Sequence, residues 1–333
     1  MVDVSRLGQV NGASDADALF LKVFAGEVLS TFQETNKFMD KHTVRTISSG
    51  KSAQFPCLGV AAARYHTPGE SVIDGADADG DNYLSKINHN ERIISIDDIL
   101  TSSVLVADAD ELMNHYDVRS EYASAIGRAL SKRMDQNVIS TIFAAAKEST
   151  PNVTGGPVGG EITMSGSTGD DLIGFAFDAA EQLDENDAPT DNRYFALRPA
   201  EYYKLIEDAG SGTALVNRDY VGGNGGLDSG VVYKVAGMTI VSTNNMRSTD
   251  SDAVTTTGEN NDVFGSAGVG YNADFSKLWG LAFTKEAVGT VKLADLSLES
   301  EYQVDRLATL FLAKYMCGHG ILRPECAVAA ITA

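Results

Sequence analysis

The feature of this sequence that most constrains its fold is a long stretch without helix breakers. Residues 108–147 contain no proline and a single glycine, Gly127, and their apolar residues recur at helical spacing. This pattern predicts a helix of up to about 40 residues, roughly 60 Å long at 1.5 Å per residue. A compact globule of the same chain length would be only about 50 Å across. We therefore expect an elongated or flat molecule that is built along this helix as a spine.

The composition is that of a folded, acidic protein. Of the 333 residues, 43% are hydrophobic and 22% are charged, which is enough apolar material for a sizeable core. The formal net charge of −20 argues against a nucleic-acid reader, because such surfaces need clustered lysine and arginine. Most of the acidic residues lie in two segments, 66–111 with net charge −9 and 160–262 with net charge −12.

No apolar stretch approaches the roughly 18 residues of a membrane span, and no secretory signal is recognisable. We therefore expect a soluble protein without a membrane partner.

The amino-terminal region contains an amphipathic helix with no core of its own. The apolar residues Phe20, Phe24, Val28 and Phe32 recur every four residues and give the predicted helix one apolar stripe. Polar sequence flanks this helix on both sides. We therefore expect it to act as an arm whose stripe needs a partner surface.

A second segment without a local core follows the arm. Short β-prone runs at 44–47, 92–96 and 103–106 lie around a long insertion, 68–90, that is rich in glycine and aspartate. They predict a hairpin with a long acidic tip. Because two strands alone are only marginally stable in water, this hairpin also needs a surface to lie against.

The rest of the chain alternates between helical and β-prone segments, which completes an α+β fold. A Gly-, Ser- and Thr-rich break is expected at 150–169, and the last strand, which ends on apolar residues, is expected at the edge of a sheet. Residues 304–317 form a mostly apolar stretch. The predicted helices are 170–184 and 199–207, and the predicted strands are 194–197, 231–235, 238–242, 278–284, 289–293 and 327–331.

No pattern of catalytic, metal-binding or cofactor-binding residues is recognisable, so we expect neither an enzyme nor a cofactor. Cys317, His319 and Cys326 match no zinc spacing, and core packing is the favoured interpretation. The Asp-rich run 77–81 lacks the first and last carboxylates of a calcium loop. The odd number of cysteines, which include Cys57, fits reduced and buried thiols. An acidic protein with an unpartnered arm and an unsupported hairpin is best explained as an assembling subunit.

Five stretches of the sequence resemble the major capsid protein of T-seven-like podoviruses, the Autographiviridae type of tailed phage. Two of them are VRTISSGKSAQFP at 44–56 and GHGILRPE at 318–325, and the others are 20–29, 113–122 and 288–293. They occur in the order found in that family. The resemblance implies the Hong Kong 97 (Johnson) capsid fold.

The resemblance also implies a division of the chain into domains. Residues 1–44 would be the N-terminal arm and 45–107 the E-loop. Residues 108–170 together with 271–333 would be the peripheral P-domain with its spine helix, and 171–270 the axial A-domain. The implied subunit contacts are Phe20, Phe24, Val28 and Phe32 in the arm and Arg45, Lys51 and Phe55 in the E-loop.

The function implied by the resemblance is self-assembly, as hexamers and pentamers, into the icosahedral head of a short-tailed bacteriophage. The head would enclose the double-stranded DNA genome without sequence-specific binding. The expected partners are further copies of the chain, a scaffolding protein during assembly, a portal protein at one vertex and a decoration protein. The expected location is the virion capsid, assembled in the host cytoplasm.

Two alternatives belong to other classes of protein. An encapsulin-type compartment shares the fold, and it would copurify with a cargo protein rather than with DNA. An unrelated acidic enzyme would be a stable and active monomer in solution.

Overall fold

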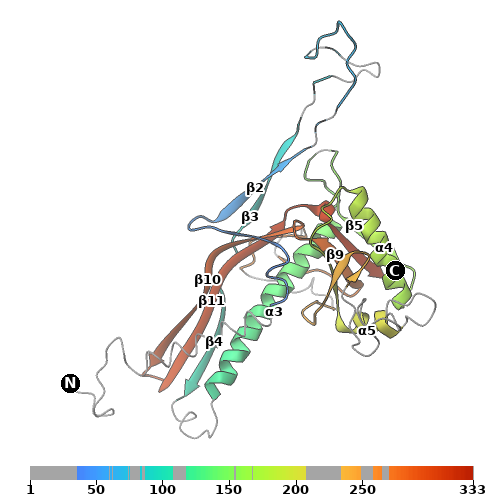
Figure 1. Cartoon of the computed structure of the whole chain (residues 1–333). Coiled ribbons are helices and arrows are strands. Elements are labelled where there is room, and N and C mark those ends of the chain that lie inside the picture. The colour runs from blue at the N-terminus through green and yellow to red at the C-terminus, as the bar shows by residue number, and fades with distance from the viewer. Residues whose placement is uncertain are drawn as a thin grey trace.

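The computed structural model describes residues 36–59, 61, 63–73, 75, 83–84, 87–107, 118–153, 155–166, 168–207, 234–248, 258–264 and 270–332. These residues form an α+β fold with three separate sheets. Figure 1 shows an elongated molecule in which a long helix and long strands run side by side, a compact α/β part adjoins one end of them, and a thin hairpin projects away from the body. This is the shape that the spine argument predicts.

The spine is helix α3, which spans Val118–Lys147. It contains no proline and only Gly127 as a poor helix former, so its residues favour the helical state. In its first half, buried side chains such as Ile126 and Leu130 face strands β4 (Leu100–Ala107) and β11 (Ala308–Ile321), and in its second half nearly every side chain is buried. The predicted helix is confirmed over these residues, and its expected first part, 108–117, lies outside the described residues.

Four strands form the first sheet, in the order β1-β10-β11-β4. β1 is parallel to β10, and the other neighbours are antiparallel. β10, with 16 residues, is far longer than the predicted strand at 289–293. β11, with 14 residues, overlaps most of the apolar stretch at 304–317, and the two strands together form one long hairpin along α3. The bounds are Thr43–Thr46 for β1, Leu100–Ala107 for β4, Val288–Gln303 for β10 and Ala308–Ile321 for β11.

Six strands form the second sheet, in the order β5-β12-β9-β6-β8-β7. The expected edge position of the last strand is wrong, because β12 lies between β5 and β9. β5 takes the edge instead, and it arises within the stretch 150–169 that was predicted to be a break. The bounds are Gly160–Met164 for β5, Arg193–Leu197 for β6, Lys234–Val235 for β7, Met238–Ser242 for β8, Leu278–Thr284 for β9 and Ala327–Thr332 for β12.

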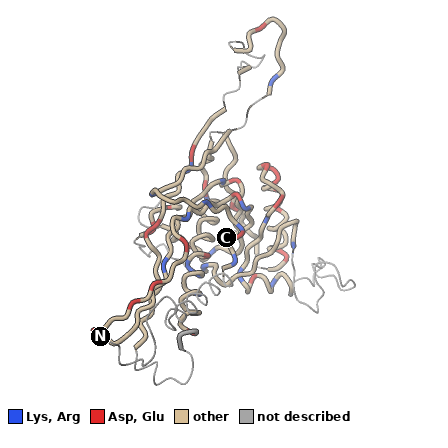
Figure 2. Tube along the Cα trace, turned by 60° about the vertical axis from the view of Figure 1, so that its left-hand side comes forward, with Lys and Arg blue, Asp and Glu red and all other residues tan. Residues whose placement is uncertain are grey.

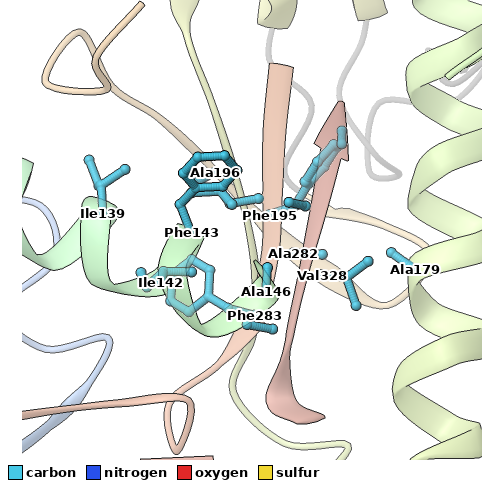
Figure 3. Close-up of a cluster of buried hydrophobic side chains, with 14 of the residues drawn as sticks. Ile139, Ile142, Phe143, Ala146, Ala179, Phe195, Ala196, Ala282, Phe283 and Val328 are labelled. Carbon is cyan, nitrogen blue, oxygen red and sulfur yellow. The ribbon is translucent and has the colours of Figure 1, made fainter. Parts of the chain in front are cut away.

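Two further helices complete the α/β part, α4 at Gly169–Glu185 and α5 at Pro199–Glu207, as predicted. α4 begins with a capping box, in which Thr168 and Asp171 satisfy each other's backbone N–H groups. None of the described helices is long and apolar enough to cross a membrane. The second sheet lies between α3 and α4, and Figure 3 shows the side chains that meet there, among them Phe143 of α3, Ala179 of α4, Phe195 of β6 and Val328 of β12.

The predicted division into arm, E-loop, P-domain and A-domain remains a prediction. The second sheet combines β5, β9 and β12, from segments assigned to the P-domain, with β6, β7 and β8, from the segment assigned to the A-domain. These segments therefore share one hydrophobic core.

Candidate assembly surface: the hairpin and its root

The third sheet is a two-stranded hairpin that stands apart from the other two. β2, Ser52–Leu58, pairs with β3, His89–Ser95, in antiparallel register. A hairpin with a long insertion is present as predicted, and β3 matches the predicted run 92–96. Its other strand, β2, was not among the predicted runs, and the runs 44–47 and 103–106 belong to β1 and β4 of the first sheet instead. Residues 63–73 of the insertion lie farther from the body than the two strands (Figure 1). Within the described part of the chain, no third strand pairs with either of them.

One face of this hairpin is open to solvent, and it carries the apolar residues Leu58 and Ile93 among the polar residues Gln54, His89 and Glu91. Ile93 is 54% exposed whereas the next residue, Ile94, is 1% exposed, so β3 turns one face outward and buries the other. Among the described residues, seven large apolar side chains are exposed on this one projection, which favours it as a site of interaction. The exposed large apolar residues of the hairpin and its insertion are Leu58, Tyr65, Val72, Ile73, Leu84, Ile87 and Ile93.

The root of the hairpin crosses β10 and β11 at three glycines. A Cβ atom on Gly318 would lie 1.9 Å from the carbonyl oxygen of Ser95, and one on Gly320 would lie 2.7 Å from Cγ1 of Ile94. A Cβ atom on Gly289 would lie 3.1 Å from Cδ1 of the same Ile94. Only residues without a side chain allow β3 to approach the sheet so closely, and this approach buries Ile94.

Two asparagine side chains form hydrogen bonds with the backbone at the end of β3. The side-chain Oδ1 of Asn261 accepts a hydrogen bond from the N–H of Ser95 at 2.9 Å, and its Nδ2 donates to the carbonyl oxygen of Ser95 at 2.6 Å. Asn260 Nδ2 donates to the carbonyl oxygen of Ile96 at 2.8 Å. The Ile96 N–H donates to the carbonyl oxygen of Lys51, at the start of the hairpin. The backbone polar groups of the root are therefore satisfied within the chain.

A buried carboxylate, Asp97, completes the root. The hydroxyl of Tyr271 donates to Asp97 Oδ2 at 2.6 Å, and the backbone N–H of Asn260 donates to Oδ1 at 2.7 Å. The backbone N–H of His319 in turn donates to the Tyr271 oxygen at 2.9 Å. Burial raises the pKa of Asp97 to about 6, although the Tyr271 hydrogen bond acts in the opposite direction. This network joins the hairpin to β11 and to the loop that precedes β9.

The chemistry of this root is structural. Thr290 Oγ1 lies 2.8 Å from His319 Nδ1, and Cys317 Sγ lies 3.5 Å from His319 Nε2. Burial raises the pKa of the Cys317 thiol far above its usual value and lowers the pKa of His319 to about 3, so both groups are neutral at pH 7. A neutral buried thiol is a poor nucleophile. Among the described residues, no cluster of histidine, cysteine and carboxylate side chains has the arrangement of a metal site.

The cysteines all carry free thiols. Cys317 and Cys326 are buried as expected, whereas Cys57 on β2 is only half-buried. The Asp-rich run 77–81, examined for calcium binding, lies outside the described residues.

Of the predicted contact residues, Arg45 lies on β1 of the first sheet, and Lys51 and Phe55 lie at the start of the hairpin. The guanidinium of Arg45 lies 5.6 Å from the centre of the Phe55 ring, and its Nη1 donates to the carbonyl oxygen of Gln54 at 2.9 Å. The structure thus brings Arg45 and Phe55 together, whereas the side chain of Lys51 is exposed. The four predicted arm contacts, Phe20, Phe24, Val28 and Phe32, lie outside the described residues.

The root residues Asp97, Asn261 and Tyr271 were not identified from the sequence. The sequence offered one signal for this root. Gly318 and Gly320 are two positions apart, so on a strand they lie on the same face, and glycines in a strand mark the close approach of another backbone.

The outer surface of α4 is acidic. Asp178, Glu181 and Glu185 are exposed on this helix, which lies in the segment with net charge −12. Figure 2 shows further acidic residues along the long strands of the first sheet. Copies of this chain would therefore repel one another at long range unless salt screens them.

Comparisons with known proteins agree on one family. The sequence profile of the Gp10A-like major capsid proteins matches residues 54–331. The major capsid protein of Escherichia phage T7 is 35% identical, over 97% of this chain and 94% of its own length, and that of Enterobacteria phage T3 is 33% identical with the same coverage. Among solved structures, the capsid of the cyanophage P-SCSP1u superimposes with a TM-score of 0.75 at 43% identity, covering 99% of this chain and 98% of the other.

Proposed function

Because the chain belongs to the Gp10A-like family of phage major capsid proteins, we propose that its hairpin is the principal surface that joins copies into hexamers and pentamers of an icosahedral head. Membership of this family favours the capsid function over both an encapsulin-type compartment and an enzyme. The open question is which of its surfaces hold the shell together.

The observation that carries this proposal is the group of large apolar side chains exposed on β2, β3 and the insertion between them. Leu58 is 69% exposed and Ile93 is 54% exposed, on a sheet of two strands. Burying such side chains against a second copy contributes about 25 cal/mol for each Å² of apolar surface removed from water. Each such contact contributes little binding free energy, but a subunit that contacts several neighbours at once is bound much more strongly than by any one of them.

The rigid root supports the same role. Since Asn261, Asp97 and the glycines of β11 fix the end of β3, the hairpin is presented in one orientation before it meets a neighbour. A pre-ordered surface loses less conformational entropy on binding than a mobile one.

The arm is the second proposed contact. The stripe that begins with Phe20, Phe24 and Val28 is apolar, and we propose that it packs on a neighbouring copy. Arg45 and Phe55 contact each other within the chain. We propose that these two side chains, together with Lys51, contact a neighbouring copy as one surface.

Further partners of the shell follow from the same proposal. A scaffolding protein would guide assembly, a portal protein would occupy one vertex, and a decoration protein would bind the outside. The net charge of −20 suits a container for double-stranded DNA, because an acidic wall confines DNA without holding it during ejection.

The proposal is tested with two variants of one exposed residue. Ile93→Asp places a charge on the open face of β3, and Ile93→Val keeps the face apolar. We expect the aspartate variant to be folded by circular dichroism but to form no shells in negative-stain micrographs when it is coexpressed with a scaffolding protein. The valine variant should assemble normally. Normal shells from Ile93→Asp would contradict the role of the hairpin.

A further inference from the structure

The two strands of the projecting hairpin are both edge strands, because no third described strand pairs with either of them (Figure 1). An edge strand presents a row of backbone N–H and C=O groups that can pair with a strand of another molecule. β2 is a hazardous template for such pairing, because its sequence SAQFPCL is mostly apolar and carries no charged residue. Edge-to-edge pairing of separate copies would compete with contacts through the exposed side chains.

The register of the hairpin determines which of these backbone groups face outward. The Ile96 N–H donates to the carbonyl oxygen of Lys51 at 2.8 Å, and the Gly59 N–H donates to that of Asn88 at 2.9 Å. In an antiparallel pair, such positions alternate with positions whose N–H and C=O groups point away from the partner strand. The outward positions are Ser52, Gln54, Pro56 and Leu58 on β2, and His89, Glu91, Ile93 and Ser95 on β3.

Two successive outward positions of β2 are closed to a further strand. Pro56 has no backbone N–H, so it offers no donor, and proline is absent from the segments that aggregate as strands. The carbonyl oxygen of Gln54 accepts a hydrogen bond from Nη1 of Arg45 at 2.9 Å. The Arg45 guanidinium also lies 5.6 Å from the centre of the Phe55 ring, so it stands where the donor of an added strand would bind.

The outward positions of β3 are closed at every second residue. The N–H of Glu91 donates to Oδ1 of Asn90 at 2.9 Å, and both backbone groups of Ser95 bind the side chain of Asn261. Within β2 and β3, therefore, no two successive outward residues keep both of their backbone groups available. A further strand could not form two neighbouring steps of a ladder on either edge.

We propose that Arg45, Pro56 and Asn90 close the edges of the hairpin to strand pairing, so that free copies of the chain do not join hairpin to hairpin. This inference goes beyond the proposed assembly function, because it concerns the subunit before it meets a neighbour. The partner that fits the hairpin is then one that packs side chains onto its exposed face, at Leu58 and Ile93, rather than one that adds a strand.

A single substitution on β2 tests the inference in the unassembled full-length chain. Pro56→Val returns the missing backbone N–H, and the variant should be folded by circular dichroism. It should self-associate at a roughly tenfold lower concentration than the parent chain, as measured by light scattering. Infrared spectroscopy of the associated material should show additional intermolecular β-sheet. A folded variant that self-associates no more than the parent chain would overturn the inference.

Two matched variants separate the strand edge from the apolar surface. Gln54→Val adds a β-branched apolar side chain to the same exposed face but returns no backbone donor, so it should leave self-association unchanged. The double variant Gln54→Pro, Pro56→Val moves the missing N–H by one outward position, and it should behave like the parent chain. Equal self-association of Gln54→Val and Pro56→Val would attribute the effect to apolar area and would contradict the inference.

Arg45→Ala provides a test that leaves β2 itself unchanged, so it applies even if Pro56→Val does not fold. Removing the guanidinium frees the carbonyl oxygen of Gln54, and self-association should begin at a several-fold lower concentration. Lys51→Ala removes a neighbouring positive charge without opening the edge, and it should not change the onset. Equal effects of these two substitutions would show that charge, rather than access to the edge, keeps the free chains apart.

Discussion

The carbonyl oxygen of Ser95 occupies the space that a side chain on Gly318 would need, with only 1.9 Å between it and a Cβ atom built on that glycine. The hairpin therefore meets the long strands backbone to backbone. The orientation of the proposed assembly surface depends on this contact.

Gly318→Ala tests that contact. Adding one methyl group against a backbone oxygen forces the root apart. We expect the free energy of unfolding to fall by about 3 kcal/mol, at the upper end of the usual cost of overpacking, and assembly to be lost. The measurement is urea denaturation of the unassembled chain. Gly174→Ala is the matched control, because Gly174 lies within α4 with no atom within 4 Å of a built Cβ, and it should gain up to about 1 kcal/mol.

Asp97→Asn tests the buried carboxylate through its pH dependence. The pKa of Asp97 is raised from 3.8 to about 6 by burial, so the folded chain binds this proton more tightly than the unfolded chain. The carboxylate therefore disfavours folding by about 3 kcal/mol above pH 6, and this penalty disappears as the pH falls toward 3.8. Measured by urea denaturation, the stability of Asp97→Asn relative to the parent chain should rise by about 2.5 kcal/mol between pH 4 and pH 7.5. A difference independent of pH would contradict the raised pKa.

His42 should act in the opposite direction. Burial lowers its pKa from 6.5 to about 4, so the unfolded chain takes up the proton first. Its contribution to stability is complete above pH 6.5 and falls by about 3 kcal/mol as the pH drops to 4. The advantage of the parent chain over His42→Asn should shrink by this amount across that range, as measured by denaturation at pH 7.5 and pH 4. If the stability difference between the parent chain and His42→Asn does not change with pH, the pKa of His42 is not lowered in the folded chain.

Much of the secondary structure could be predicted from the sequence because its signals are local. The strands at 238–242 and 278–284 and the helix at 199–207 follow from apolar periodicity and from flanking turn residues. The interior position of β12 could not be predicted, because it depends on β5, which lies more than 160 residues earlier in the chain. Strand order is a long-range property that local patterns do not encode.

The candidate site was predictable only in part, for the same reason. The sequence showed one strand of the hairpin, because the β-prone run 92–96 matches β3, whereas β2 was not predicted and the run 44–47 belongs to the first sheet. The root of the hairpin was not predicted, because Asp97 and Tyr271 are 174 residues apart and neither belongs to a recognisable motif. Only the spacing of Gly318 and Gly320 hinted that another backbone passes close by.

Salt should strengthen assembly. The segment 160–262 carries net charge −12, and a capsomer would bring several copies together. The screening length falls from about 30 Å at 0.01 M ionic strength to about 8 Å at 0.15 M, which removes most of the repulsion. Light scattering of the chain with a scaffolding protein should show faster assembly at 0.15 M, and Asp178→Asn with Glu181→Gln should weaken this dependence. Faster assembly at low salt would mean that attractive charge pairs dominate the contacts.

The central claim, that the hairpin joins neighbouring copies, is tested most directly by hydrogen–deuterium exchange of residues 52–58 and 89–95 in the free subunit and in the complete shell. The outer edges of a two-stranded sheet exchange readily in the free chain, so contact with a neighbour should slow them. We predict that exchange in these residues slows at least tenfold on assembly. Unchanged exchange in both strands, with slower exchange elsewhere in the chain, would contradict the account.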